Sequence, residues 1–236
     1  LGSVFLISGV IALFVELLIL GLGRPQRGLN IVPLAGSFGL LMVTVWVSSI
    51  QWAEPRGVLA VAAVQGNLDQ RTKWQSRQFD ANFERHWQPT LGLSEADLVV
   101  WPEASFTDFK NNRPQLLQSM DAAVSERGQG LIIGLPDRNE SGYTNTALGL
   151  GEVDGSYAKR HLVPFGEYVP LERWLRGAIA FFDLPMSRNQ PGPQVQAPLS
   201  LKGQPLSLSI CYEIAYPHLV RSAATQPMAL VTISRS

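Results

Sequence analysis

The sequence predicts an α/β domain of layered strands and helices, preceded by two transmembrane helices. Two observations lead to this fold class. Charged residues make up 16% of the chain, well below the usual quarter, and the shortage is concentrated in the first 50 residues. From residue 58 onward, short apolar strand patterns alternate with helical patterns, which is typical of layered α/β packing.

Two apolar segments come first in the chain. Residues 1–23 carry one charged side chain, Glu16, and residues 29–50 carry none. A helix of either length can cross a hydrocarbon core of about 30 Å, at about 1.5 Å per residue. We therefore predict transmembrane helices over residues 1–23 and 29–50, and a multi-pass membrane protein.

The charges between these two segments predict the topology. Arg24 and Arg27 lie in the connection 24–28, and positively charged connections of this kind stay in the cytoplasm. Residues 57–236 then form a domain on the opposite side, which is the periplasmic side of the inner (plasma) membrane in a Gram-negative bacterium.

The elements of this domain follow from local patterns. Apolar runs predict strands at 58–65, 96–105, 130–136 and 143–151, at the start of 155–170, and at 206–210 and 228–234. Large side chains at helical spacing predict a helix over about 70–93, and a second helical segment ends near Gly128. Because the last predicted element is a strand, we expect the domain to be incomplete at its C-terminal end.

Composition argues against several classes of site. The chain has 19 basic and 19 acidic residues, so no basic excess points to nucleic acid as a partner. Cys211 is the single cysteine, which excludes an intrachain disulfide. Three histidines without a Cys/His cluster give no metal-site pattern, and we predict neither a metal nor a cofactor.

Three polar residues, Glu103, Lys159 and Cys211, each lie at or just beyond the end of a predicted strand; the strand pattern of 96–105 breaks at Pro102, just before Glu103. Sites in α/β sheets collect at strand ends, where loops vary on a rigid scaffold. A thiol attacks a carbonyl as the thiolate, but its ordinary pKa of about 8.5 leaves little thiolate at neutral pH. A carboxylate can take the thiol proton, and an ammonium can stabilise the resulting oxyanion. The three residue types together can therefore carry out acyl transfer.

Each of these residues also has a purely structural interpretation. Cys211 could be a buried inert thiol, Glu103 an acid at a helix N-terminus, and Lys159 a solvated charge at a strand edge. A Cys–His dyad with His161 or His218 is a further alternative, although nothing in the local sequence orients either imidazole.

The local sequences around the three residues carry a resemblance. The segments VVWPEAS around Glu103, YAKRHLVPFGEYVP around Lys159 and SICYEIAYP around Cys211 resemble the three catalytic blocks of the nitrilase (carbon–nitrogen hydrolase) superfamily, in the same order. The second block, the CYE of the third and the segment VQGNLDQRTKW at 64–74 resemble the apolipoprotein N-acyltransferase family more specifically. The resemblance implies a nitrilase-like α-β-β-α sandwich, truncated here because the family normally continues beyond the last strand.

The resemblance also implies roles for individual residues. Glu103 would be the general base, Lys159 the electrostatic stabiliser and Cys211 the nucleophile of a Glu–Lys–Cys triad. The backbone N–H of Tyr212 would join Lys159 in the oxyanion hole. The residues implied to support this triad are Glu167 beside the lysine, Tyr212 and Glu213 after the nucleophile, and Trp74 on a loop over the pocket.

For function, the resemblance implies a two-step acyl transfer. An acyl chain moves from a membrane phospholipid to Cys211 as a thioester, and then to the N-terminal amine of a diacylglyceryl apolipoprotein. The apolar run 178–186 would either contact the membrane interface or form a core helix. Two alternative functions use the same fold: a membrane-tethered amidase or nitrilase that hydrolyses a small amide, and a non-catalytic membrane-bound binding module.

Overall fold

The computed structural model of the protein describes residues 8–15, 19, 31–51, 57–139, 142–164, 166–168, 189–223 and 228–234. The chain divides into two units, Leu1–Val58 and Leu59–Ser236, and each is described by itself. The connection 24–28 and the apolar run 178–186 lie outside the described residues.

The N-terminal unit is helical in both regions predicted to span the membrane. Residues 8–15 are helical, and helix α2, Ile31–Ser49, occupies most of the second region. Among the described residues, however, no helix combines the length and the apolar character that a membrane crossing needs. Both spans therefore stay predictions.

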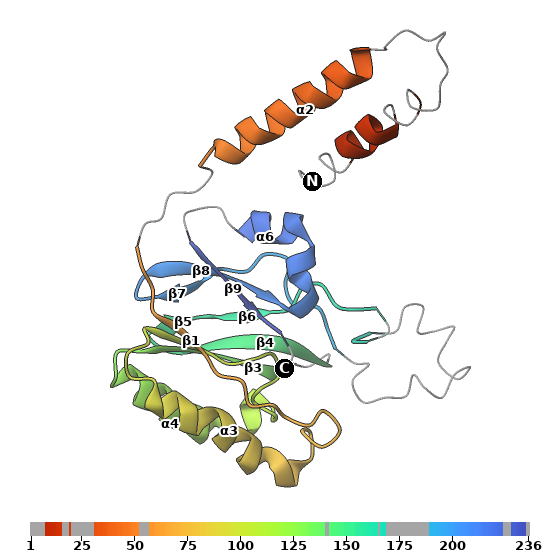
Figure 1. The fold of residues 1–236 in the computed structure, drawn as a ribbon. Coiled ribbons are helices and arrows are strands. Elements are labelled where there is room, and N and C mark those ends of the chain that lie inside the picture. The colour runs from red at the N-terminus through yellow and green to blue at the C-terminus, as the bar shows by residue number, and fades with distance from the viewer. Residues whose placement is uncertain are drawn as a thin grey trace, which may run out of the picture. The chain divides into compact units, whose positions relative to one another are not determined.

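The larger unit is built on two β-sheets. The first has five strands in the order β1-β2-β3-β4-β6 (Figure 1). Strands β1, β2 and β3 run parallel, whereas β4 pairs antiparallel with both β3 and β6. The bounds of these strands are β1 Val61–Ala63, β2 Leu98–Val100, β3 Gly130–Asn139, β4 Gly142–Gly151 and β6 Ser156–Ala158.

The second sheet has four strands in the order β5-β7-β8-β9. Strand β7 pairs antiparallel with β5 and β8, and β8 pairs parallel with β9. The bounds are β5 Val153–Asp154, β7 Leu199–Leu201, β8 Gln204–Ile210 and β9 Ala229–Ile233.

Helices lie on the outer side of each sheet (Figure 1). Helices α3 and α4 cover the first sheet, and α6 lies on the second. The layers therefore run helix, sheet, sheet, helix, as the resemblance implied. The helices in the described part of this unit are η1 Ser76–Gln78, α3 Phe79–Gly92, η2 Lys110–Asn112, α4 Pro114–Ser125, η5 Cys211–Ala215 and α6 Pro217–Ala223.

Alternation along the strands separates two apolar cores. On β3, Leu131 and Ile133 join the core beneath α3 and α4, whereas Ile132 joins the core between the sheets. On β8, Leu208 and Ile210 also join the inter-sheet core. This separation follows from the two-residue period of a strand, and burying each such side chain stabilises the fold by about 1.5–3 kcal/mol.

The strands and helices predicted from sequence are largely confirmed, but their bounds differ. The helix expected over 70–93 begins at Ser76, because Asp69 organises a turn first: its carboxylate accepts a hydrogen bond from Arg71 N at 3.0 Å. Strands β5 and β7 are absent from the sequence prediction. They have two and three residues and, unlike the equally short β1 and β2, they do not lie within a longer apolar run that marks a strand.

Candidate active site

Three strand ends bring the predicted site residues into one region. Glu103 follows β2, Lys159 follows β6 directly, and Cys211 follows β8. Backbone hydrogen bonds hold these ends. Glu103 N donates to Ser234 O at 3.2 Å, beyond β9 of the second sheet, and Lys159 N donates to Asn145 O at 2.8 Å, on β4 of the first sheet. The region is therefore assembled from both sheets.

The turn that carries Glu103 lies directly on strand β3. Ala104 has a φ of +52°, so the chain reverses sharply after Glu103. Gly134 of β3 allows the close approach, because a Cβ at this position would lie 2.6 Å from Pro102 O and 2.8 Å from Glu103 Cα. A side chain at position 134 would displace Glu103.

Lys159 lies between two carboxylates and is almost fully buried. Its Nζ donates to Glu167 Oε1 at 2.8 Å and to Glu103 Oε1 at 3.5 Å. The second oxygen of Glu167 accepts a hydrogen bond from Val163 N at 2.9 Å. Burial alone would lower the pKa of Lys159, but the Glu167 hydrogen bond and the negative charges of Glu103, Glu167 and Cys211 raise it above its ordinary value. Lys159 is therefore an ammonium at neutral pH.

The two carboxylate oxygens of Glu103 have different surroundings. Oε1 accepts hydrogen bonds from Asn145 Nδ2 at 2.6 Å and from Lys159. Oε2 is buried and has no hydrogen-bond partner among the described residues. Buried polar atoms are nearly always satisfied, so among the described residues this oxygen stands out as an unpaired hydrogen-bond acceptor of the cluster.

Asn145 belongs to this site although the sequence analysis did not single it out. Its side chain is buried in the middle of β4 and fixes Glu103 through the 2.6 Å hydrogen bond. In the sequence, Asn145 is only a polar residue within a predicted strand, and such residues are common on half-exposed strands. Its partner Glu103 lies 42 positions away, so no local pattern links the two residues.

Cys211 lies at the point where β8 becomes the 3₁₀ helix η5. Its φ is +55°, a left-handed conformation that costs a residue with a Cβ about 1–3 kcal/mol. The side chain is partly exposed. A negative charge on its sulfur contributes to the raised pKa of Lys159, so the thiol lies within electrostatic range of the ammonium.

Glu213 connects the two loops that carry Cys211 and Lys159. Its carboxylate is buried and accepts hydrogen bonds from Ile210 N at 2.8 Å, before Cys211, and from Arg160 N at 2.7 Å and His161 N at 3.0 Å, after Lys159. The Tyr157 hydroxyl donates to the same carboxylate at 3.0 Å. Glu213 thus holds the loop that carries Cys211 against the loop that follows Lys159.

The sequence profile of the carbon–nitrogen hydrolase family matches residues 60–236. The chain belongs to the carbon–nitrogen hydrolase family. Two solved structures share this fold: a mutant of the amidase from Nesterenkonia sp. with an acetamide moiety added covalently at its active-site cysteine (TM-score 0.53, 22% identity, 77% of this chain and 67% of that chain), and the carbon–nitrogen hydrolase from Helicobacter pylori (TM-score 0.53, 20% identity, 75% of this chain and 59% of that chain).

Curated relatives of this carbon–nitrogen hydrolase are more similar in sequence. The apolipoprotein N-acyltransferase of Azotobacter vinelandii is 38% identical over 99% of this chain and 47% of its own length. The protein of the same name from Pseudomonas syringae pv. tomato is 39% identical over 83% of this chain and 41% of its own length. The chain therefore spans about half the length of the curated relatives it matches.

The remaining predicted residues of this carbon–nitrogen hydrolase lie around the buried cluster. The Tyr212 side chain is 49% exposed, and its ring contacts that of Tyr216 at 5.4 Å between centroids. The rings of His161 and His218 also contact Tyr216, at 4.0 and 5.8 Å. Neither imidazole makes a hydrogen bond to Cys211, so a Cys–His dyad has no support among the described residues.

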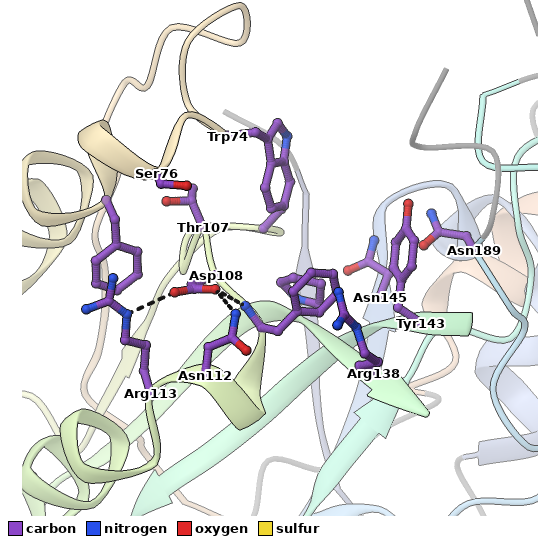
Figure 2. Close-up of a pocket in the computed structure, with 14 residues that line it drawn as sticks. Trp74, Ser76, Thr107, Asp108, Asn112, Arg113, Arg138, Tyr143, Asn145 and Asn189 are labelled. Atoms are coloured by element: carbon purple, nitrogen blue, oxygen red, sulfur yellow. Dashed lines mark hydrogen bonds and ion pairs between the residues drawn. The ribbon is translucent and has the colours of Figure 1, made fainter. Parts of the chain in front are cut away.

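Trp74 lies at a pocket beside the cluster (Figure 2). The pocket has a volume of about 390 Å³ and is also lined by Ala104 and Asn145. Ala104 directly follows Glu103 in the chain, and Asn145 donates a hydrogen bond to Glu103. The Trp74 side chain is 39% exposed. Among the described residues, no group of three or more His, Cys, Asp or Glu side chains could hold a metal ion.

Proposed function

We propose that this chain is the catalytic part of an apolipoprotein N-acyltransferase, which moves a fatty acyl chain from a membrane phospholipid to the N-terminal amine of a diacylglyceryl apolipoprotein. The main support for this proposal is the similarity to relatives of that name, such as the Azotobacter vinelandii protein, which is 38% identical over 99% of this chain. The buried cluster of Glu103, Lys159 and Glu167 next to the single thiol supports it chemically.

The first half-reaction forms a thioester on Cys211. Glu103 Oε2, the oxygen without a hydrogen-bond partner among the described residues, accepts the thiol proton. The thiolate attacks the ester carbonyl of the phospholipid, and Lys159 together with the backbone N–H of Tyr212 stabilises the oxyanion. The intermediate collapses, the C–O bond breaks, and the glycerol oxygen leaves with the proton held by Glu103. The lysophospholipid is then free to depart.

The second half-reaction transfers the acyl chain to the apolipoprotein. The neutral N-terminal amine attacks the thioester carbonyl, and the same donors stabilise the second oxyanion. Glu103 accepts the proton that the nitrogen loses as the amide forms. The C–S bond breaks, and the departing sulfur takes this proton, so the enzyme returns to its starting state. Glu167 keeps Lys159 in place through both steps, since it makes the shorter contact of 2.8 Å.

Both substrates are held in the membrane by their acyl chains, so the predicted membrane helices would keep the enzyme next to them. Removing an acyl chain from the bilayer costs about 0.8 kcal/mol per CH₂, so the reaction is best performed at the membrane surface. We place the predicted spans 1–23 and 29–50 in the inner membrane and the catalytic domain on its periplasmic side.

The test uses the full chain in detergent micelles with a phospholipid labelled in its acyl chain. We expect the label on Cys211 as a thioester in the first step, and on the amine of a diacylated lipopeptide in the second. Cys211→Ser should abolish both products. Labelled free fatty acid in place of N-acyl product would indicate the alternative amidase-type hydrolysis. An unlabelled thiol, with function kept in Cys211→Ser, would indicate the non-catalytic module.

A further inference from the structure

The pocket next to the catalytic cluster contains a buried polar group that no described residue satisfies. The Asn189 side chain lines this pocket and is 6% exposed, and its Oδ1 has no hydrogen-bond partner among the described residues. Figure 2 shows Asn189 beside Asn145 and Tyr143 along one side of the pocket. A buried amide of this kind is costly to leave unpaired, so it points to a ligand.

The backbone holds Asn189 firmly in this position. Asn189 forms a β-bridge with Tyr143 of β4, and Gln190 N donates to Tyr143 O at 2.8 Å. The segment that carries Asn189 is therefore paired with β4, the strand that carries Asn145, and the Asn145 amide donates to Glu103. The unpaired group thus lies on the pocket wall that leads to the proposed general base.

Two charged side chains at this pocket already have partners. Asp108 accepts hydrogen bonds from Asn112 Nδ2 at 2.6 Å and from Arg113 Nε at 2.9 Å. The Arg138 guanidinium packs over the Phe109 ring at 4.2 Å. Among the described residues that line the pocket, Asn189 Oδ1 is the buried side-chain atom without a hydrogen-bond partner, and a ligand in the pocket could supply this bond.

The chemistry of an asparagine amide favours a peptide bond as this ligand. Its Oδ1 needs a donor, which a peptide N–H provides, and its Nδ2 can donate to a peptide carbonyl. A peptide unit satisfies the side chain in either orientation of the amide. The phosphodiester and ester groups of a phospholipid offer acceptors alone, so that a phospholipid could pair Oδ1 only through a donor in its head group. The pocket therefore suits the acceptor substrate better than the donor.

We propose that Asn189 binds the first peptide unit of the acyl acceptor and accepts the N–H of its second residue. This inference rests on the proposed function, since it assumes that an N-terminal amine attacks a thioester on Cys211. Consecutive Cα atoms lie about 3.8 Å apart, so the proposal requires Asn189 to lie about one peptide unit away from the attacking amine. Asn189 is then a specificity-determining residue for peptide-linked amines.

The experiment compares two diacylated lipopeptides that differ in one group, the N–H of the second residue, which is methylated in one of them. With the full chain in detergent, we expect kcat/KM for the N–H acceptor to exceed that for the N-methyl acceptor by about 10-fold. In Asn189→Leu, which has a similar volume and no polar atom, this ratio should fall to about 1. Asn189→Asp keeps an acceptor oxygen and should keep the preference.

Gln190→Leu is the matched control, because it makes the same change one residue away, outside the pocket lining, and should keep the wild-type ratio. Thioester formation from labelled phospholipid is measured separately for each variant. Absence of thioester in the wild-type protein would refute the proposed function. Normal thioester formation with equal use of both acceptors by the wild type, or an unchanged ratio in Asn189→Leu, would refute the role of Asn189. If Asn189→Leu does not fold, the comparison of the N–H and N-methyl acceptors with the wild-type protein still tests the proposal.

Discussion

At the scale of single residues, Lys159 carries its charge in a buried site because two carboxylates compensate it. The Lys159 side chain is 1% exposed, and its Nζ lies 2.8 Å from Glu167 and 3.5 Å from Glu103. Because these groups raise the pKa of Lys159, it cannot serve as the base that deprotonates the thiol. We expect it to act as a fixed positive charge, which leaves the proton transfer to Glu103.

Replacing Lys159 tests this division of roles. In Lys159→Ala the oxyanion loses its ammonium, and the single-turnover rate of thioester formation from labelled phospholipid should fall by about 10²–10³-fold. His161→Ala is the control: this residue is two positions away, its ring contacts Tyr216, and most of the rate should remain. A large loss in His161→Ala with little loss in Lys159→Ala would instead support a Cys–His dyad.

The same cluster sets the sign of the pH dependence of stability. The pKa of Lys159 in the folded protein is raised above its ordinary 10.5, so the folded state binds this proton more tightly than the unfolded state. The contacts of Lys159 therefore contribute fully to the free energy of unfolding below the pKa of the lysine in the unfolded state. This contribution is lost as the pH rises through the pKa of the lysine in the folded state. The thermal midpoint should consequently fall less between about pH 9 and about pH 12 in Lys159→Ala than in the wild type.

At the scale of elements, one carboxylate fixes the relative position of two strand ends. Glu213 accepts the backbone N–H of Ile210 at the end of β8 and those of Arg160 and His161 just after β6. These elements belong to different sheets. The distance between Cys211 and Lys159 therefore depends on Glu213, although Glu213 itself need not touch a substrate.

We predict that Glu213→Gln loosens this connection. The substitution places an NH₂ group where backbone N–H donors converge, and should lower the free energy of unfolding by about 2 kcal/mol, a fall in melting temperature of roughly 4–8 °C. The rate of thioester formation should fall as well. Glu126→Gln, an exposed residue just after α4, should change stability by less than about 0.5 kcal/mol. Equal melting temperatures for both variants would contradict the role given to Glu213.

The elements also explain how far the sequence could predict this site. Glu103, Lys159 and Cys211 were accessible for two reasons: each lies at or just beyond the end of an apolar strand pattern, where sites of α/β folds collect, and the segments around them resemble the nitrilase blocks. Asn145 and Asn189 were not accessible, because their importance depends on partners and burial that arise only when β4 pairs with distant segments. Strand periodicity gives the face of a residue but not the identity of its neighbour.

At the scale of the whole molecule, the two units pose different problems for prediction. In Leu59–Ser236, alternation of strands and helices gave the layers, while the very short β5 and β7 became visible only through their pairing. In Leu1–Val58, hydropathy predicts two spans, and helix α2, Ile31–Ser49, falls within the second. The connection 24–28 lies outside the described residues, and the side of the membrane on which it lies is predicted from its two arginines.

Reporter fusions in living bacteria measure this topology. Arg24 and Arg27 should keep the connection 24–28 in the cytoplasm, which places Ala60 and everything after it in the periplasm. An alkaline phosphatase fused after Ala60 should be active, because its disulfides form in the oxidising periplasm and not in the cytoplasm. The same enzyme fused after Gln26 is the matched control and should be inactive. Activity after Gln26 with none after Ala60 would put the catalytic domain in the cytoplasm, away from secreted acceptors, and the proposed reaction could not take place there.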